Sequence, residues 1–140
     1  MAVIAADQVT KAIVRGSLAP GAERRVLPGV LWFVRATNSG VAFNIFSGSA
    51  VGVTLIALVV LAVLVWFFAK HATQRLLWLP TGMIAGGAVG NLIDRLRVGA
   101  VTDFIKLPDW PAFNLADSAI TVGVVLLILL IGRGGTARTA

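Results

Sequence analysis

Cysteine is absent from this chain of 140 residues, which excludes a disulfide, a thiolate nucleophile and a thiolate metal site. Histidine occurs once, as His71, beside Lys70 in a short basic connection. A single histidine argues against a histidine metal cluster and against a Ser-His-Asp triad, and we interpret His71 as a loop residue. The sequence therefore predicts a protein that works without a metal or another cofactor.

Charge is also scarce. Charged residues make up 13% of the chain and hydrophobic residues 58%, whereas soluble domains have about 25% and about 45–50%. This composition predicts a single integral membrane domain over residues 1–140. The net charge of +6 would suggest nucleic acid in a soluble protein. Because the bases form no long run, we interpret them as lipid-headgroup anchors and expect no nucleic-acid partner. They include Arg24, Arg25, Arg35, Lys70, Arg75, Arg95, Arg97, Lys106, Arg133 and Arg138.

Long hydrophobic stretches predict the fold. The clearest covers residues 50–69, which are twenty residues without a charge. As a helix they would extend about 30 Å, the thickness of one bilayer core. In all, the pattern predicts four transmembrane helices, at about residues 1–18, 50–69, 76–95 and 113–132. We therefore expect a membrane α-helical protein, a four-transmembrane-helix bundle.

The first predicted span carries Asp7, Lys11 and Arg15 at intervals of four residues. This spacing puts the three side chains on one helical face, which we expect to turn toward the bundle, with Asp7 and Lys11 paired. The segment lacks the basic start and the small-residue cleavage site of a secretory signal.

The third predicted span carries a stripe of small residues. Gly82, Gly86 and Gly90 repeat at intervals of four, which permits close contact with a neighbouring helix. We interpret the stripe as general helix packing.

A small β element is predicted outside the membrane, at about residues 26–48. Residues 30–34 and 41–46 are rich in β-branched and aromatic side chains, which is typical of strands. Asn38-Ser39-Gly40 between them has the composition of a turn.

Four spans would put both termini on one side of the membrane. The bases at Lys70, Arg75, Arg133 and Arg138 lie on that side and favour it as cytoplasmic. The β element and the loop at residues 97–111 then share the outer side.

The stretch from Gly90 to Asp117 holds four of the six acidic residues. Asp103 and Asp117 sit at the mouths of long apolar segments, where an ionisable group indicates function by default. Two carboxylates close together cannot both ionise easily, so one keeps a proton. The ionised member can then take a proton from water while the other polarises a peptide carbonyl. This constellation favours an aspartic peptidase over a Ser-Lys dyad, because no serine has an obvious position opposite Lys11.

Simpler interpretations remain for these aspartates. Asp103, in the extended piece 101–104, is compatible with a solvated loop residue. Asp117 is compatible with a helix N-cap, but Phe113 and Leu115 favour a helix that has already begun. Asp109, between prolines, is predicted to lie in a turn.

Two groups of polar residues accompany the aspartates. Asn91, Asp94 and Arg95 share a helical face, where Asp94 and Arg95 also fit a simple ion pair at the membrane boundary. Asn91 is deeper, and a buried amide needs partners. Asn114 stands three residues before Asp117.

Two other classes of function suit intramembrane polar residues. A small transporter or proton-conducting bundle would distribute them through the membrane depth, whereas here they gather at one face. A non-catalytic assembly protein would need only the glycine stripe, and it should tolerate substitution of Asp103.

Four motifs together resemble those of the signal peptidase II family, the bacterial lipoprotein signal peptidases. They are Asp7-Gln8-Val9-Thr10-Lys11, Asn38-Ser39-Gly40-Val41-Ala42-Phe43, Gly90-Asn91-Leu92-Ile93-Asp94-Arg95 followed by Gly99-Ala100-Val101-Thr102-Asp103-Phe104, and Phe113-Asn114-Leu115-Ala116-Asp117. Their order between four apolar segments makes the resemblance specific. The apolar stretch before Asp7 is shorter than the one that usually precedes this motif in the family.

The resemblance implies a membrane aspartic endopeptidase with Asp103 and Asp117 as its catalytic pair. It implies substrate binding by Asn38, Asn91, Asp94, Arg95 and Asn114, and structural support from Asp7 and Lys11. The implied substrate is a prolipoprotein whose lipobox cysteine carries diacylglycerol, cleaved just before that cysteine. The implied location is the bacterial inner membrane, among membrane lipids, with cytoplasmic termini, an outward-facing site and the β element as an extracytoplasmic cradle.

Overall fold

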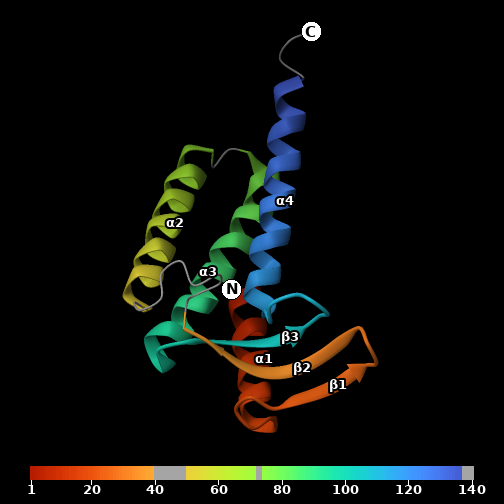
Figure 1. Cartoon of the computed structure of the whole chain (residues 1–140). Helices are drawn as coiled ribbons and strands as arrows, with labels where there is room; N and C mark the ends of the chain where they lie inside the picture. The colour runs from red at the N-terminus through yellow and green to blue at the C-terminus, as the bar shows by residue number, and fades with distance from the viewer. Residues whose placement is uncertain (40–49, 72–73, 137–140) are drawn as a thin grey trace.

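The computed structural model describes residues 1–39, 50–71 and 74–136, as four long helices and a small sheet (Figure 1). The elements in chain order are α1 (Ala2–Ser17), β1 (Glu23–Leu27), β2 (Leu31–Asn38), α2 (Ala50–Lys70), the 3₁₀ turn η2 (Arg75–Leu77), α3 (Trp78–Val98), β3 (Val101–Lys106) and α4 (Leu115–Thr136). The four helices lie where the sequence predicts apolar helical segments.

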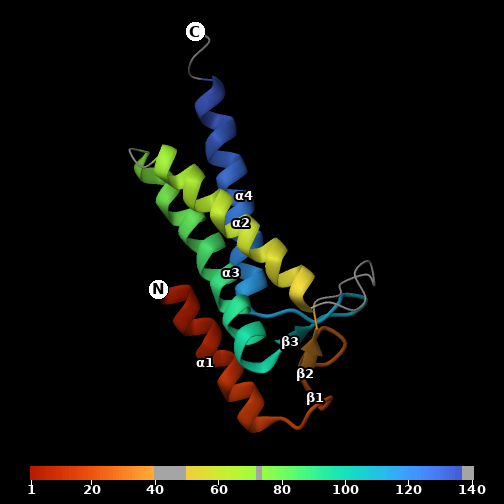
Figure 2. The ribbon, with the colours of Figure 1, turned by 90° about the vertical axis from the view of Figure 1, so that its left-hand side faces the viewer.

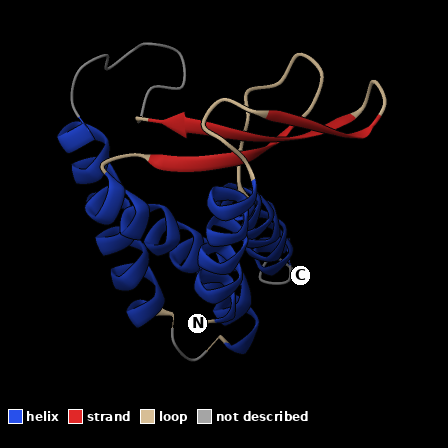
Figure 3. Ribbon diagram, turned by 90° about the horizontal axis from the view of Figure 1, so that it is seen from below, coloured by secondary structure: helices blue, strands red, loops and turns tan. Residues whose placement is uncertain are grey.

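The helices run alternately toward and away from the sheet, which lies across one end of the bundle (Figures 1 and 3). The N-terminus of α1 is level with the middle of α3 and with the sheet-side end of α4, so α1 accompanies the sheet-side half of α3 and only the first turns of α4 (Figure 2). α1 contacts both α3 and α4, and it also touches β2 and β3. This end of the bundle is therefore where α1, α3, α4 and the sheet converge.

The sheet is antiparallel, in the order β1-β2-β3. β2 pairs with β3 through Ala36 opposite Asp103, so the β element and the 97–111 segment form one unit, as their predicted shared side requires. The predicted loop at 97–111 is wrong in part, because it contains β3. β1 was not expected at all, and its hairpin turn lies between Leu27 and Leu31. Asn38 ends β2 and does not stand in a turn, and the predicted strand at 41–46 lies outside the described residues.

Glycine ends α3 and starts the approach to β3. Gly99 has φ 80°, a left-handed conformation that glycine adopts without a Cβ clash, and its N–H caps the Arg95 carbonyl. Beyond β3 the chain turns back through Asp109, which lies in a turn as predicted and has φ 53°. The return pairs Phe113 with Ile105. This return places the start of α4 beside β3.

Two glycines of α3 allow α1 to approach closely. A Cβ on Gly86 would lie 2.9 Å from the Val3 Cβ, and one on Gly90 would lie 2.6 Å from an Asp7 carboxylate oxygen. The predicted stripe is therefore confirmed at these two positions. It is wrong at Gly82, where an added Cβ would meet nothing within 4 Å.

The tightest contact between α3 and α4 uses a glycine outside that stripe. A Cβ on Gly87 would lie 2.4 Å from the Ala116 carbonyl oxygen and 2.8 Å from Ile120 Cγ1. A Cβ on Gly123 of α4 would likewise lie 2.9 Å from the Pro80 carbonyl oxygen. Backbone atoms cannot swing aside as a side chain can, so α3 and α4 pack with no room for a methyl group.

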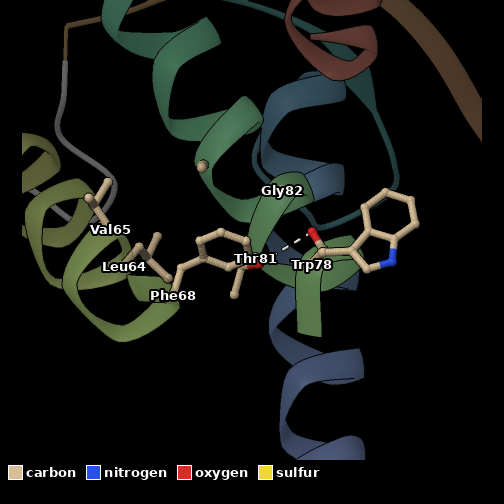
Figure 4. A pocket seen from close by; sticks show the side chains of 7 residues that line it. Leu64, Val65, Phe68, Trp78, Thr81 and Gly82 are labelled. Carbon is tan, nitrogen blue, oxygen red and sulfur yellow. Dashed lines mark hydrogen bonds between the residues drawn. The ribbon is translucent and has the colours of Figure 1, made fainter. Parts of the chain in front are cut away.

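α2 packs against α3, and most of its large apolar side chains are exposed. Between the two helices, at the end away from the sheet, lies an apolar pocket of about 200 Å³ (Figure 4). Its one hydroxyl among the described lining residues, that of Thr81, donates to the Leu77 and Trp78 carbonyls. The rest of the described lining is apolar or aromatic.

By length and hydropathy, one helix among the described residues is long and apolar enough to cross a membrane. It is Leu115–Gly132, with a mean hydropathy of 2.4. Thr54–Lys70 forms a shorter apolar helical stretch. The other two helices carry polar residues on the faces that meet inside the bundle, Asp7 and Lys11 on α1 and Asn91 and Asp94 on α3.

The end of α1 is held by the sheet. Arg35 of β2 donates from Nη1 to the carbonyls of Arg15 and Leu18, at 3.0 and 2.9 Å. The last carbonyls of a helix have no partner within it, so this cation satisfies them and also suits the negative end of the helix dipole.

The α3–α4 contact gives a stability test. Gly87→Ala should lower the free energy of unfolding by about 1–3 kcal/mol, as expected for an overpacked contact. Gly82→Ala is the matched control in the same helix, and it should leave stability unchanged or raise it by up to about 1 kcal/mol. Thermal unfolding of both purified variants in detergent measures the difference. Equal stability of Gly87→Ala and the parent protein would contradict the described packing.

Candidate active site

A cavity of about 810 Å³ opens where the sheet meets the start of α4. Three of the six acidic side chains line it, namely Asp103, Asp109 and Asp117, together with the end of β2 at Asn38 and Ser39. The loop residues 110–113 complete its wall. The two aspartates predicted to meet, Asp103 and Asp117, therefore face one space.

Asp103 is carried by β3 and is 2% exposed. Its two oxygens accept separate hydrogen bonds, from Asn114 Nδ2 at 2.7 Å and from Asn38 Nδ2 at 2.9 Å. Burial raises the pKa of Asp103 to about 6, and the nearby Asp117 carboxylate raises it as well, while the two amide donors oppose the shift. Asp103 is thus a carboxyl group that gains a proton just below neutral pH, and it is no solvated loop residue.

Asp117 belongs to a capping box at the start of α4. The helix begins at Leu115, so Asn114 is the N-cap: its Oδ1 accepts from the Asp117 N–H at 3.0 Å. In return, Asp117 Oδ2 accepts from the Asn114 N–H at 3.1 Å. The expectation that the helix begins before Asn114 is therefore wrong, and a capping role applies to this pair. A partly exposed carboxylate in a first helical turn also benefits from the helix dipole.

Asn114 joins the two aspartates. It is fully buried, and it binds Asp103 through its side-chain nitrogen and Asp117 through its backbone. Asn91 of α3 completes the link, since its Nδ2 donates to Asp117 Oδ1 at 2.8 Å and its Oδ1 accepts from Asn114 Nδ2 at 3.0 Å. The two carboxylates thus share Asn114 as a partner, and Asn91 bonds both Asn114 and Asp117.

Beneath the asparagines lies a buried charge cluster. Lys11, with no exposed surface, contacts Asp7 at 2.9 Å, Asn91 Oδ1 at 2.8 Å and Asp94 at 3.3 Å. The predicted Asp7–Lys11 pair is confirmed, and Asp7 also accepts from the Ala116 N–H in the first turn of α4. The cluster connects α1 to the starting turn of α4.

Asp94 lies in this cluster and is 1% exposed. Its oxygens meet Lys11, the Arg15 guanidinium at 3.4 Å and the Thr102 N–H at 3.0 Å. Asp94 and Arg95 form no close ion pair, although Asp94 still acts electrostatically on Arg95. Asp94 instead ties α1 and α3 to the strand that carries Asp103.

Arg95 projects from the same helix with unused hydrogen-bonding capacity. Its Nη1 donates to the Asn91 carbonyl at 3.4 Å, and its Nε is buried without a partner among the described residues. Its guanidinium interacts electrostatically with both Asp117 and Asp103. Arg95 is therefore a cation at the site with donors to spare.

Three residues of the network were missed as site residues. Gln8 Nε2 donates to the Gly90 carbonyl and to Asp94, Arg15 binds Thr102, and Thr102 lies next to Asp103 in β3. The signal for Gln8 and Thr102 was their place within the recognised motifs, and Arg15 continues the spacing of Asp7 and Lys11. Within the described ranges, no three His, Cys, Asp or Glu side chains gather as a metal site.

Comparison with known proteins covers nearly the whole chain. Residues 1–132 match a protein-family model described as signal peptidase (SPase) II. A lipoprotein signal peptidase of Syntrophomonas wolfei is 43% identical over 129 residues, covering 92% of this chain and 87% of the relative. One of Dehalococcoides mccartyi is 44% identical over 136 residues, covering 91% and 82%.

Solved structures agree in fold. One, described as a bacterial membrane enzyme determined by the in meso method at 2.3 Å resolution, has a TM-score of 0.89 at 34% identity and covers 98% of this chain and 87% of that chain. A second, determined at 1.9 Å, has a TM-score of 0.84 at 36% identity and covers 92% and 86%.

The hydrogen bonds to Asp103 give a titration test. Asn38→Leu removes a donor that stabilises the carboxylate, so the pKa of Asp103 should rise from its value of about 6. Infrared difference titration of the carboxyl stretch, assigned with Asp103→Asn, measures the shift. A fall in that pKa, or no change, would contradict the described contact.

Proposed function

The chain belongs to the signal peptidase II family, and from this premise we propose that it removes the signal peptide of prolipoproteins by cleaving just before a diacylglyceryl-modified cysteine. It is a protease of the aspartic type and a membrane protein. The observation that carries the proposal is the arrangement of Asp103 and Asp117, which face one cavity and share Asn114 as a partner.

The two carboxylates suit different roles in peptide hydrolysis. Asp103 is buried and has a raised pKa of about 6, so it takes up a proton more readily than an ordinary aspartate and suits the role of the acid. Asp117 is partly exposed, lies in a first helical turn and accepts two N–H donors, so it is the ionised base.

In the proposed reaction, Asp117 takes a proton from water, and the water oxygen attacks the scissile carbonyl carbon. Asp103 gives its proton to the carbonyl oxygen, which forms a tetrahedral diol. Asp117 then returns a proton to the amide nitrogen as the C–N bond breaks, and the diol proton goes back to Asp103. No covalent intermediate and no metal enters these steps.

The remaining site residues divide by exposure. Asn38 lines the cavity, and Arg95 is partly exposed and interacts electrostatically with both aspartates, so we assign substrate contacts to these two. Asn91, Asp94 and Asn114 are buried, at 8%, 1% and 0% exposure, which favours support of the aspartates over the direct substrate contact expected from the sequence. Asp7 and Lys11 keep the supporting role that the sequence implies.

We place the chain in the bacterial cytoplasmic membrane with four spans, α1 to α4, and both termini in the cytoplasm. The sheet end of the bundle, with the active site, would then face outward. This placement is supported by the apolar surfaces of α2 and α4 and by the burial of the polar faces of α1 and α3 within the bundle. The sheet would lie on the outer leaflet as a cradle for the substrate, with membrane lipids around the helices.

Substitution of the aspartates tests the mechanism. Asp103→Asn and Asp117→Asn should each lower the single-turnover rate by about 10²–10⁴-fold, because the amide can neither accept nor donate the transferred proton. The double variant should be scarcely slower than either single variant, since the two groups act as one unit. The measurement uses a lipidated lipobox peptide and each purified variant.

Asp109→Asn is the matched control. Asp109 lines the same cavity, but it lies in a turn and forms no described hydrogen bond to the aspartates. Asparagine also tolerates its positive φ. This variant should keep its single-turnover rate within a few-fold of the parent rate. An Asp109→Asn protein as inactive as the other two would contradict the assignment of Asp103 and Asp117 as the catalytic pair.

The substrate's lipid gives a second test. Burial of acyl methylenes contributes about 0.8 kcal/mol each, so the diacylglyceryl group should dominate substrate affinity. The parent enzyme should cleave a lipidated peptide at least a hundred-fold more efficiently than the same peptide with a free cysteine, compared by kcat/KM. Equal cleavage of the two peptides would argue against a prolipoprotein substrate while leaving the peptidase chemistry intact.

A further inference from the structure

We propose that Lys11 is a positioning residue for the catalytic base: its ammonium fixes the orientation of the Asn91 amide and thereby aims an N–H donor at Asp117. The inference rests on the proposed function, because it assigns a role in that same reaction. It starts from a charge that the mechanism above does not use.

The ammonium of Lys11 is matched by its surroundings. It has three donors and no acceptor, and three oxygens lie within reach, one each from Asp7, Asn91 and Asp94. Two of the three acceptors are carboxylates, which would suffice to balance the charge. The third, Asn91 Oδ1, is the closest of them at 2.8 Å.

This contact determines which way the Asn91 amide faces. An ammonium can only donate, so the atom of Asn91 that faces it must be the oxygen. The amide nitrogen then points the other way, where it meets Asp117 Oδ1 at 2.8 Å. With the amide reversed, Nδ2 would face the ammonium and Oδ1 would face the carboxylate, and both contacts would be repulsive.

The same logic reaches Asn114 from two directions. Asn91 Oδ1 also accepts from Asn114 Nδ2 at 3.0 Å, so the fixed oxygen requires a nitrogen opposite it. Independently, the Asp117 N–H requires an oxygen, which Asn114 Oδ1 provides at 3.0 Å. The two requirements select the same orientation of Asn114, which directs Nδ2 to Asp103. The buried cation thus acts directly on the hydrogen bond to Asp117 and, together with the Asp117 N–H, on the one to Asp103.

Removal of the ammonium should weaken this constraint. Asn91 would keep its contacts with Asp117 and Asn114 but lose the one that holds its oxygen from the other side, so its amide could shift and its bond to Asp117 could lengthen. Loss of alignment at a reacting group costs up to about 10²-fold in rate. The loss should fall on kcat, because neither Lys11 nor Asn91 is among the residues that line the cavity.

The experiment uses a variant built to fold. Lys11→Met alone leaves Asp7 without its cation, so it is paired with Asp7→Asn, which neutralises both members of the buried pair. This pair variant should lower kcat by about 10- to 100-fold with KM within about three-fold. Lys106→Met is the control, since it removes a cation that pairs with Glu23 on the exposed sheet and touches neither asparagine. It should keep kcat within about three-fold.

A double-mutant cycle that combines the pair variant with Asn91→Leu separates a positioning role of Lys11 from a general structural role. Without the amide there is nothing to orient, so adding the pair variant to Asn91→Leu should slow kcat by no more than about three-fold. Additive losses would overturn the inference, as would full kcat in the pair variant or an equal loss in Lys106→Met. Failure of both Lys11→Met and the pair variant to fold would assign Lys11 to folding and also overturn it. A parent enzyme that does not cleave the lipidated peptide would instead contradict the proposed function itself.

Discussion

An ammonium group cut off from water is the constraint on which the rest of this site depends. Lys11 has no exposed surface, and such a charge is tolerated only when every donor finds an oxygen. The oxygens come from α1 itself and from α3, while the carboxylates that supply two of them also bind backbone N–H groups of α4 and β3. Satisfying one cation therefore draws together α1, α3, α4 and β3, of which the last two carry Asp117 and Asp103. The glycines at positions 86 and 90 matter for the same reason, because a side chain at either would hold α1 away from α3.

Much of this arrangement could be predicted from the sequence, because its signals are local. The interval of four between Asp7 and Lys11 puts them on one helical face, and length and hydropathy locate the four helices. The choice of Asp103 and Asp117 also came from local context, as acidic residues at the ends of apolar segments. That Asp94 would bind Lys11 across two helices could not be read this way, since its neighbour Arg95 offered a nearer partner in sequence.

The errors share a physical cause, which is that tertiary contacts decided what local preference left open. β1 is exposed along its whole length and carries Glu-Arg-Arg, so nothing in its own residues indicates a strand, and only pairing with β2 makes it one. The start of α4 was placed too early because Phe113 is apolar, whereas its backbone is used by Ile105 of β3. Gly87 was overlooked because it stands outside the interval of four, yet it faces the closest backbone of α4.

The strand β2 bonds both α1 and the catalytic site. Arg35 donates to the last carbonyls of α1, and Asn38, three residues later, donates to Asp103. Three residues of extended chain cover about 10 Å. α1, which carries Lys11, and β3, which carries Asp103, are therefore bonded to the same short stretch of β2. A displacement of β2 would change both the Arg35 bonds to α1 and the Asn38 bond to Asp103. The sheet and α1 are therefore directly connected, and a displacement of the sheet would be transmitted to the end of α1.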